Sequence, residues 1–253
     1  MPETAPDLLA LAIAAHGGAE RWATVAELRF RLRVRGTILA FRGRSPGWRH
    51  LDVALSTTRI HARLAPFPRA GAVGVLNGTT VRIEDESGQV LSERTDAERA
   101  TRRAYLWDDL DELYFLAYAF WNYATTPFLL AWPGIECHEL APVASSIRRS
   151  AVANGPLRRL RVRFPPGIPT HCPEQTFYFS ADGLLRRLDY TADVFGALAR
   201  GAHLCEAHKT FDGIVIPTHR RVVPRPVGRW TLPGPLAMEG WIDEVEVVSR
   251  GEV

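Results

Sequence analysis

The chain has 253 residues, which is enough for one large domain with a substantial buried core. Apolar residues make up 46% of it and charged residues 23%, which are usual values for a globular protein and exclude a chain that is disordered throughout. The net charge is only +3, and Lys209 is the only lysine beside the arginines. No basic cluster is interleaved with stacking aromatic groups, so we expect no nucleic-acid partner.

The apolar stretches are shorter than a membrane-spanning helix requires, and three cysteines do not form a disulfide framework in a chain of this length. The apolar run at residues 8–15 follows acidic residues, whereas a secretory signal begins with basic ones. Arginine in place of lysine is typical of GC-rich bacterial genomes. We therefore expect a cytoplasmic, bacterial protein without stable membrane insertion; the sequence leaves its oligomeric state open.

The first elements are a short helix and a series of strands. The helix is expected at residues 8–16, with Asp7 as its N-cap and Gly17 just beyond its end. Period-two patterns then predict strands between residues 28 and 94, and one of these is the segment Thr37–Phe41.

The middle of the chain, residues 96–132, is predicted to be helical. Its strongest helix is Asp108–Ala124, which begins with acidic residues that suit the positive end of the helix dipole. The second half of this helix is apolar on nearly every side, so other elements must cover it. Antiparallel strands resume over residues 135–248 and include a meander from Pro165 to Val223.

No repeat, linker or low-complexity tract divides the chain, so we predict a single domain over residues 1–253. The expected fold class is mainly β with a helical insertion (α+β). A strongly curved antiparallel sheet, a half-barrel, would hold the helices in its concave face. A curved sheet must bury that face, and the apolar central helix is the natural filler.

A helix ending at Gly17-Gly18 is followed by a strand series, a helical plug and a closing meander that contains the hairpin EQTFYFSADGLLRRLDY at residues 174–190. This order resembles the lipoprotein-carrier superfamily (LolA/LolB-like). The resemblance implies an unclosed β-barrel with helices over its mouth. It also implies an apolar cavity between sheet and helices that holds an acyl chain or another apolar ligand.

Aromatic side chains are the candidates for contact with such a ligand, because small-molecule pockets are largely apolar with a few polar anchors. The central helix carries six aromatic residues between positions 114 and 123, and the meander carries two tyrosines. The predicted ligand-binding residues are Tyr114, Tyr118, Trp121, Tyr178 and Tyr190. The alternative is that these rings only fill the concavity of the sheet.

The meander also holds the titratable groups that suit acid–base chemistry. The predicted catalytic residues are His171, His203, His208 and Asp189, since histidine exchanges protons near neutral pH and a carboxylate orients it. A metal site is a further hypothesis, with His171, His203, Cys205 and His208 as its ligands. In a strand, His203 and Cys205 share one face while His208 points to the other.

Three functional hypotheses follow from these features. The first is a protein that binds an apolar, lipid- or polyketide-like small molecule and catalyses its cyclisation, isomerisation or elimination by acid–base chemistry. The second is a non-catalytic carrier or sensor of an apolar ligand, and the third and weakest is a metal-dependent enzyme. The sequence leaves open whether the protein is an enzyme, and no cofactor is expected.

Overall fold

The computed structural model describes residues 7–144, 155–226, 228, 231–232 and 234–251. The strands before the helical region are β1 Val25–Arg35, β2 Arg49–Ser56, β3 His61–Ala65, β4 Ala72–Asn77, β5 Thr80–Asp85 and β6 Val90–Arg94. The strands after it are β7 Glu136–Val143, β8 Leu157–Arg163, β9 Glu174–Phe179, β10 Leu185–Thr191, β11 Arg200–Phe211, β12 Ile214–Pro224 and β13 Met238–Ser249.

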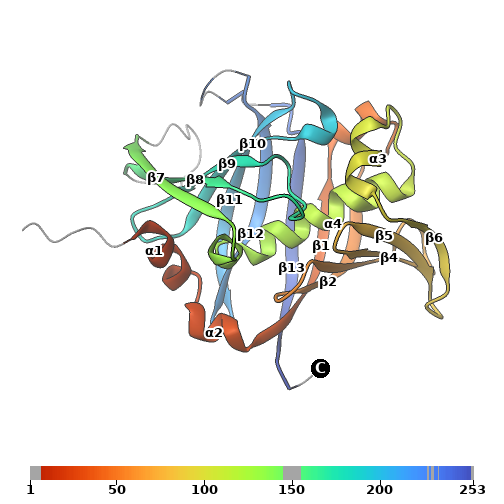
Figure 1. The fold of residues 1–253 in the computed structure, drawn as a ribbon, viewed down its shortest axis with the longest axis horizontal. Helices are drawn as coiled ribbons and strands as arrows, with labels where there is room; N and C mark the ends of the chain where they lie inside the picture. The colour runs from red at the N-terminus through yellow and green to blue at the C-terminus, as the bar shows by residue number, and fades with distance from the viewer. Residues whose placement is uncertain (1–6, 145–154, 227, 229–230, 233, 252–253) are drawn as a thin grey trace, which may run out of the picture.

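These strands form one 13-stranded sheet in the order β6-β5-β4-β3-β2-β1-β13-β12-β11-β10-β9-β8-β7 (Figure 1). The strands β6 and β7 are its two edges, so the sheet is open. All twelve neighbouring pairs are antiparallel. The predicted class, a mainly β protein with a helical insertion on a half-barrel, is confirmed.

The helices are α1 Leu8–Ala15, α2 Ala19–Thr24, α3 Ala97–Arg103 and α4 Asp109–Thr125, and the 3₁₀ turns are η1 Thr37–Arg42, η2 Phe128–Ala131 and η3 Asp193–Phe195. Within the described part of the chain, none of the helices is both long and apolar enough to cross a membrane.

The central helix α4 begins where its capping residues predict. The Asp108 carboxylate accepts a hydrogen bond from the Asp111 backbone N–H at 2.9 Å, and the Asp111 carboxylate accepts one from the Asp108 N–H at 3.2 Å. This capping box satisfies two N–H groups at the helix start. Most of α4 is buried, as its uniformly apolar second half requires.

Helix α4 lies across the concave face of the sheet (Figure 1). Close approach is possible on β4 because residue 74 is glycine: a Cβ there would lie 2.3 Å from Leu113 Cδ1. At the start of the helix, the buried Glu112 forms ion pairs of 2.7 Å with both Arg44 and Arg49. Shape and paired charge together therefore set the position of α4 over the sheet.

The prediction of a strand at Thr37–Phe41 was wrong, since this segment is the 3₁₀ turn η1. The Leu39 N–H donates to the Gly36 carbonyl at 3.2 Å, which is the i→i−3 pattern of such a turn. The Ile38 N–H donates to the carbonyl of Ala237, 199 positions along the chain, also at 3.2 Å. A distant segment thus overrides the local alternation of the sequence.

Strands β12 and β13 pair over only part of their lengths. The pairs run from His219 with Trp241 to Val222 with Met238. Beyond Trp241, β13 continues along β1, and the structure shows no further pairing with β12 among the described residues. The middle of the sheet therefore separates into two branches, and α4 lies across them.

Candidate functional site

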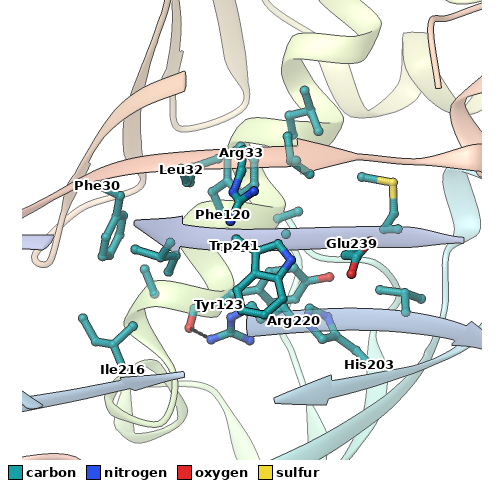
Figure 2. A pocket seen from close by; sticks show the side chains of 18 of the residues that line it. Phe30, Leu32, Arg33, Phe120, Tyr123, His203, Ile216, Arg220, Glu239 and Trp241 are labelled. Carbon is teal, nitrogen blue, oxygen red and sulfur yellow. Dashed lines mark hydrogen bonds between the residues drawn. The ribbon is translucent and has the colours of Figure 1, made fainter. Parts of the chain in front are cut away.

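The main pocket lies between α4 and the centre of the sheet (Figure 2). The helix contributes residues that recur at three- and four-residue intervals and so share one face. They are Phe115, Leu116, Ala119, Phe120, Tyr123 and Ala124. The other faces of α4 pack into the core, so the pocket is bounded by a single aromatic-rich stripe of the helix.

The strands contribute alternate residues, as expected for one face of a sheet. From β1 these are Phe30, Leu32 and Val34, and from β12 they are Ile216, Arg220 and Val222. On β13 the inward positions are Met238, Gly240 and Ile242. Almost all of this wall is apolar, and Arg220 is the charged exception among its inward strand positions.

The pocket is narrow and partly open. Its cavity volume is about 90 Å³. Arg33, Glu239 and Trp241 also line it, although they lie on the outer side of their strands. The pocket thus reaches the place where β12 and β13 separate.

A cluster of tyrosines and histidines lies at one side of the pocket. Tyr118 Oη lies 2.9 Å from His171 Nδ1, and Tyr123 Oη hydrogen-bonds His171 Nε2. Tyr190 stacks on the His171 ring at a centroid distance of 4.1 Å, and its hydroxyl lies 3.2 Å from Tyr123 Oη. Burial lowers the pKa of His171 from 6.5 to about 3, so its imidazole is neutral at physiological pH.

His203 belongs to the same cluster but has no such partners. Its ring is edge-on to that of Tyr123 at a centroid distance of 4.3 Å. The side chain is buried, and neither ring nitrogen has a hydrogen-bond partner within the described residues. Burial, and then the positive charge of Arg220, hold the pKa of His203 well below its usual value. A neutral imidazole therefore offers the pocket one donor and one acceptor.

Arg220 is held by uncharged acceptors. Its Nη2 donates to the Tyr123 backbone carbonyl at 3.0 Å, the contact drawn in Figure 2, and its Nη1 donates to Cys205 Sγ at 3.3 Å. The guanidinium carbon lies 5.2 Å from the centre of the Tyr123 ring. Neither acceptor is charged, so the site combines a neutral histidine with a half-buried cation.

No protein-family model and no curated protein sequence matches the chain. Among solved structures, it is similar to a LolA superfamily protein from Nitrosomonas europaea, with a TM-score of 0.53 and 8% identity, over 94% of this chain and 91% of that one. The fold is LolA-like. A DUF1329 family protein from Desulfovibrio piger also matches, with a TM-score of 0.51 and 12% identity, over 95% of this chain and 91% of that one.

These likenesses confirm the predicted resemblance at the level of the fold. At identities of 8% and 12% they show the fold alone. What this LolA-like chain binds must be argued from its own side chains.

The structure does not bring the four predicted catalytic residues together. Only His203 lines the pocket, and His171 lies behind it with both nitrogens bonded to tyrosines. His208 hydrogen-bonds the Leu185 carbonyl at 2.9 Å, away from the pocket lining. Asp189 points to the outer face of the sheet, opposite to its neighbour Tyr190.

On that outer face Asp189 is the centre of a separate polar cluster. Its carboxylate accepts bonds of 2.6 and 2.9 Å from the Arg187 guanidinium and one of 2.9 Å from Tyr178 Oη. Arg225 Nε lies 3.6 Å away. Tyr178 is therefore a partner of Asp189 on the outer side, and of the five predicted ligand-binding residues only Tyr190 lines the main pocket.

The other three lie elsewhere on α4. Trp121 donates from Nε1 to the carbonyls of Ser56 and Arg59, both at 3.0 Å, which fixes the helix to the loop between β2 and β3. Tyr118 bonds His171, and Tyr114 is buried beside it at a ring distance of 5.0 Å. These rings fill the concavity, the alternative that the sequence left open.

The proposed metal ligands also lie apart. Among the described residues, no group of three or more histidine, cysteine, aspartate and glutamate side chains is placed to hold a metal ion. His171 is enclosed by tyrosines, Cys205 accepts from Arg220, and the His208 ring lies 6.3 Å from that of His16. The geometry thus does not support a centre built from these residues.

Sequence reasoning missed Arg220 as a site residue. The signal was present, since alternation along β12 puts Arg220 on the same face as Ile216 and Val222. An arginine at an apolar, inward position of a strand needs a reason, because such side chains are almost never fully buried without a partner.

Proposed function

We propose that the protein binds an apolar small molecule, lipid-like or polyketide-like, in the pocket between α4 and the centre of the sheet. The observation that carries this proposal is the pocket wall, which a stripe of α4 and the inward residues of β1, β12 and β13 form almost entirely from apolar side chains. Mostly apolar walls with a few polar groups are typical of small-molecule pockets. The LolA-like fold is compatible with such a cavity.

Binding without chemistry, as in a carrier or sensor, is favoured over acid–base catalysis. Of the predicted acid–base residues only His203 lines the pocket. Its depressed pKa makes the imidazole a weak base, and general-base catalysis is most effective when the pKa of the base lies near the working pH. Cyclisation, isomerisation or elimination is therefore the second candidate, supported by the two ring nitrogens of His203 that have no hydrogen-bond partner among the described residues.

The test is a variant that places a larger side chain inside the pocket. Gly240 lies on β13 opposite Val34 and Arg220 and lines the pocket. A Cβ at this position would meet only the Arg33 carbonyl, at an ordinary 3.8 Å. The variant Gly240→Leu should therefore fold normally and occupy the pocket. The matched control is Gly47→Leu, which adds the same side chain at an exposed turn.

The measurement is binding of the uncharged fluorescent probe N-phenyl-1-naphthylamine by the purified proteins. We expect saturable binding by the wild type and by Gly47→Leu, and at least about tenfold weaker binding by Gly240→Leu. Equal binding by Gly240→Leu and the wild type would show that the probe lies elsewhere. Absence of binding to the wild type would remove the proposal.

The cytoplasm is the location we propose for this binding. Fractionation of the source cells with an antibody against the protein tests it, and recovery with the secreted or envelope fraction would contradict it.

A further inference from the structure

The charge of Arg220 is not balanced by any acid in the described structure. The hydrogen bonds that Arg220 makes there go to a thiol and to a backbone carbonyl, and no carboxylate forms an ion pair with it. A guanidinium has five N–H donors, so most of its capacity is left for another group. Leaving a cation beside an apolar pocket costs free energy unless something compensates it.

Two carboxylates on the strands beside β12 are engaged by other side chains. Glu206 accepts bonds of 2.7 and 2.8 Å from Arg221, which lies on the outer face. Glu239 accepts a bond of 2.6 Å from Arg35 and lies 3.3 Å from His219. Arg220 therefore takes no part in the ion pairs that Glu206 and Glu239 form with other described residues.

His203 is the second polar group that faces the pocket without a partner. It lies on β11 opposite Val222, two positions along the strand from Cys205, which is the residue opposite Arg220. Such diagonal neighbours on one face of a sheet are within reach of long side chains. Both ring nitrogens are buried and unbonded within the described residues. An oxygen-bearing group next to Arg220 would satisfy the ring N–H as well.

We infer that the ligand is an amphipathic monocarboxylate, a fatty acid of medium chain length, whose carboxylate lies between Arg220 and His203 and whose chain runs along α4. This inference rests on the proposed function and adds the chemical class of its ligand. The carboxylate supplies the negative charge that Arg220 lacks and an acceptor for the His203 N–H. Hydrogen bonds between charged groups of this kind are the strong ones in proteins.

The rest of the pocket suits one unbranched chain. Phe115 and Phe120 of α4 form one wall, and Phe30 and Leu32 of β1 form the other. The small cavity volume, about 90 Å³, favours a flexible chain over a polycyclic molecule. Arg220, which has no charge partner among the described residues, and His203, which has no hydrogen-bond partner among them, are diagonal neighbours, which matches a ligand with a single polar end.

The experiment compares three ligands that have the same unbranched ten-carbon chain and differ in the charge of the polar end. Decanoate, decan-1-ol and decyltrimethylammonium are titrated against the probe N-phenyl-1-naphthylamine bound to the full-length protein. We expect decanoate to bind at least about tenfold more tightly than decan-1-ol, and the cation to bind most weakly. Equal affinity for decanoate and decan-1-ol would overturn the inference but leave the proposed function standing. If neither these ligands nor the probe binds, both fail.

Variants then assign the preference to Arg220. The change Arg220→Gln should weaken decanoate binding about tenfold and leave decan-1-ol within about twofold, whereas Arg220→Lys should retain the preference for the acid. The matched control is Arg221→Gln, the same change one residue further on and on the opposite face. His203→Phe, which keeps the ring, should weaken decanoate binding about threefold. An Arg220→Gln protein that folds and still prefers decanoate would refute the assignment.

Discussion

Arg220 and Arg221 are consecutive residues of β12 that point to opposite faces of the sheet. Their partners differ in charge. On the outer face, Arg221 makes a two-bond ion pair with Glu206 at 2.7 and 2.8 Å. On the inner face, Arg220 contacts a thiol and a carbonyl. Arg221 thus belongs to a structural ion pair, whereas the charge of Arg220 is available to a ligand in the pocket.

The same contrast holds on the neighbouring hairpin of β9 and β10. Outward, Asp189, Arg187 and Tyr178 satisfy one another within a buried cluster. Inward, Tyr190 adjoins His203, whose nitrogens have no partner in the described structure. Since buried polar groups are normally bonded, the face with unmet bonding capacity is the one expected to receive a ligand. The outer face should therefore govern stability, and the inner face binding.

The largest expected effect is on the outer face, at Asp189. The change Asp189→Ala removes the buried ion pair between this carboxylate and the Arg187 guanidinium, which is only 2% exposed. Removal of one member of a buried ion pair typically costs about 3–5 kcal/mol. Urea unfolding should show this loss, while the affinity of the folded protein for N-phenyl-1-naphthylamine is unchanged.

The control for this prediction is Asp52→Ala, which removes an aspartate whose side chain is 68% exposed in its pair with Arg31. Exposed pairs contribute little, so no measurable change is expected there. If Asp189→Ala were as mild as Asp52→Ala, the cluster of Asp189, Arg187 and Tyr178 would not stabilise the fold as a unit.

The next effect concerns His171, which lies on the inner face but is fully satisfied by tyrosines. Its pKa is about 3 in the folded protein and about 6.5 in the unfolded chain. Above pH 6.5 both states leave it neutral. As the pH falls from 6.5 toward 3 only the unfolded chain takes up the proton, so stability is lost. At pH 5 this loss amounts to about 2 kcal/mol for His171 alone.

The measurement is the free energy of unfolding at pH 7 and at pH 5 for the wild type and for His171→Gln. The variant should be less stable at pH 7, but its further loss on acidification should be smaller than that of the wild type by about 2 kcal/mol. His16 and His203 are also buried and His208 is half-buried, but they contribute to both proteins and cancel in the difference. Parallel losses would contradict the assignment, as would a His171 ring that titrates near pH 6 by NMR.

Sequence patterns predicted those parts of the fold that depend on local chemistry. The Asp108 cap and the uniformly apolar helix after it indicated α4 and its burial. Period-two alternation indicated most strands. The segment Thr37–Phe41 also alternates, but its conformation depends on a bond to Ala237 far along the chain, which no local pattern records.

The site was predictable only in part, for a similar reason. Alternation places Arg220 and His203 on inward faces, and the sequence did single out His203 and Tyr190. Whether a carboxylate lies beside Arg220 depends on the register of β11 and β13, which is a non-local property. Alternation also puts Asp189 and Tyr190 on opposite faces, so only one of them can face the pocket; the sequence does not say which, and in the structure it is Tyr190 that lines the pocket.

The smallest expected effects come from two tyrosines that face opposite sides of the β9–β10 hairpin. Tyr178→Phe removes a hydrogen bond of 2.9 Å to the Asp189 carboxylate and should cost about 2 kcal/mol of stability, because the acceptor is charged. Tyr190→Phe removes a 3.2 Å contact with the neutral hydroxyl of Tyr123 and should cost about 1 kcal/mol. Of the two, only Tyr190 lines the main pocket. Tyr190→Phe should therefore change decanoate affinity, whereas Tyr178→Phe should not. The reverse pattern would mean that the two faces of the sheet do not divide stability from binding.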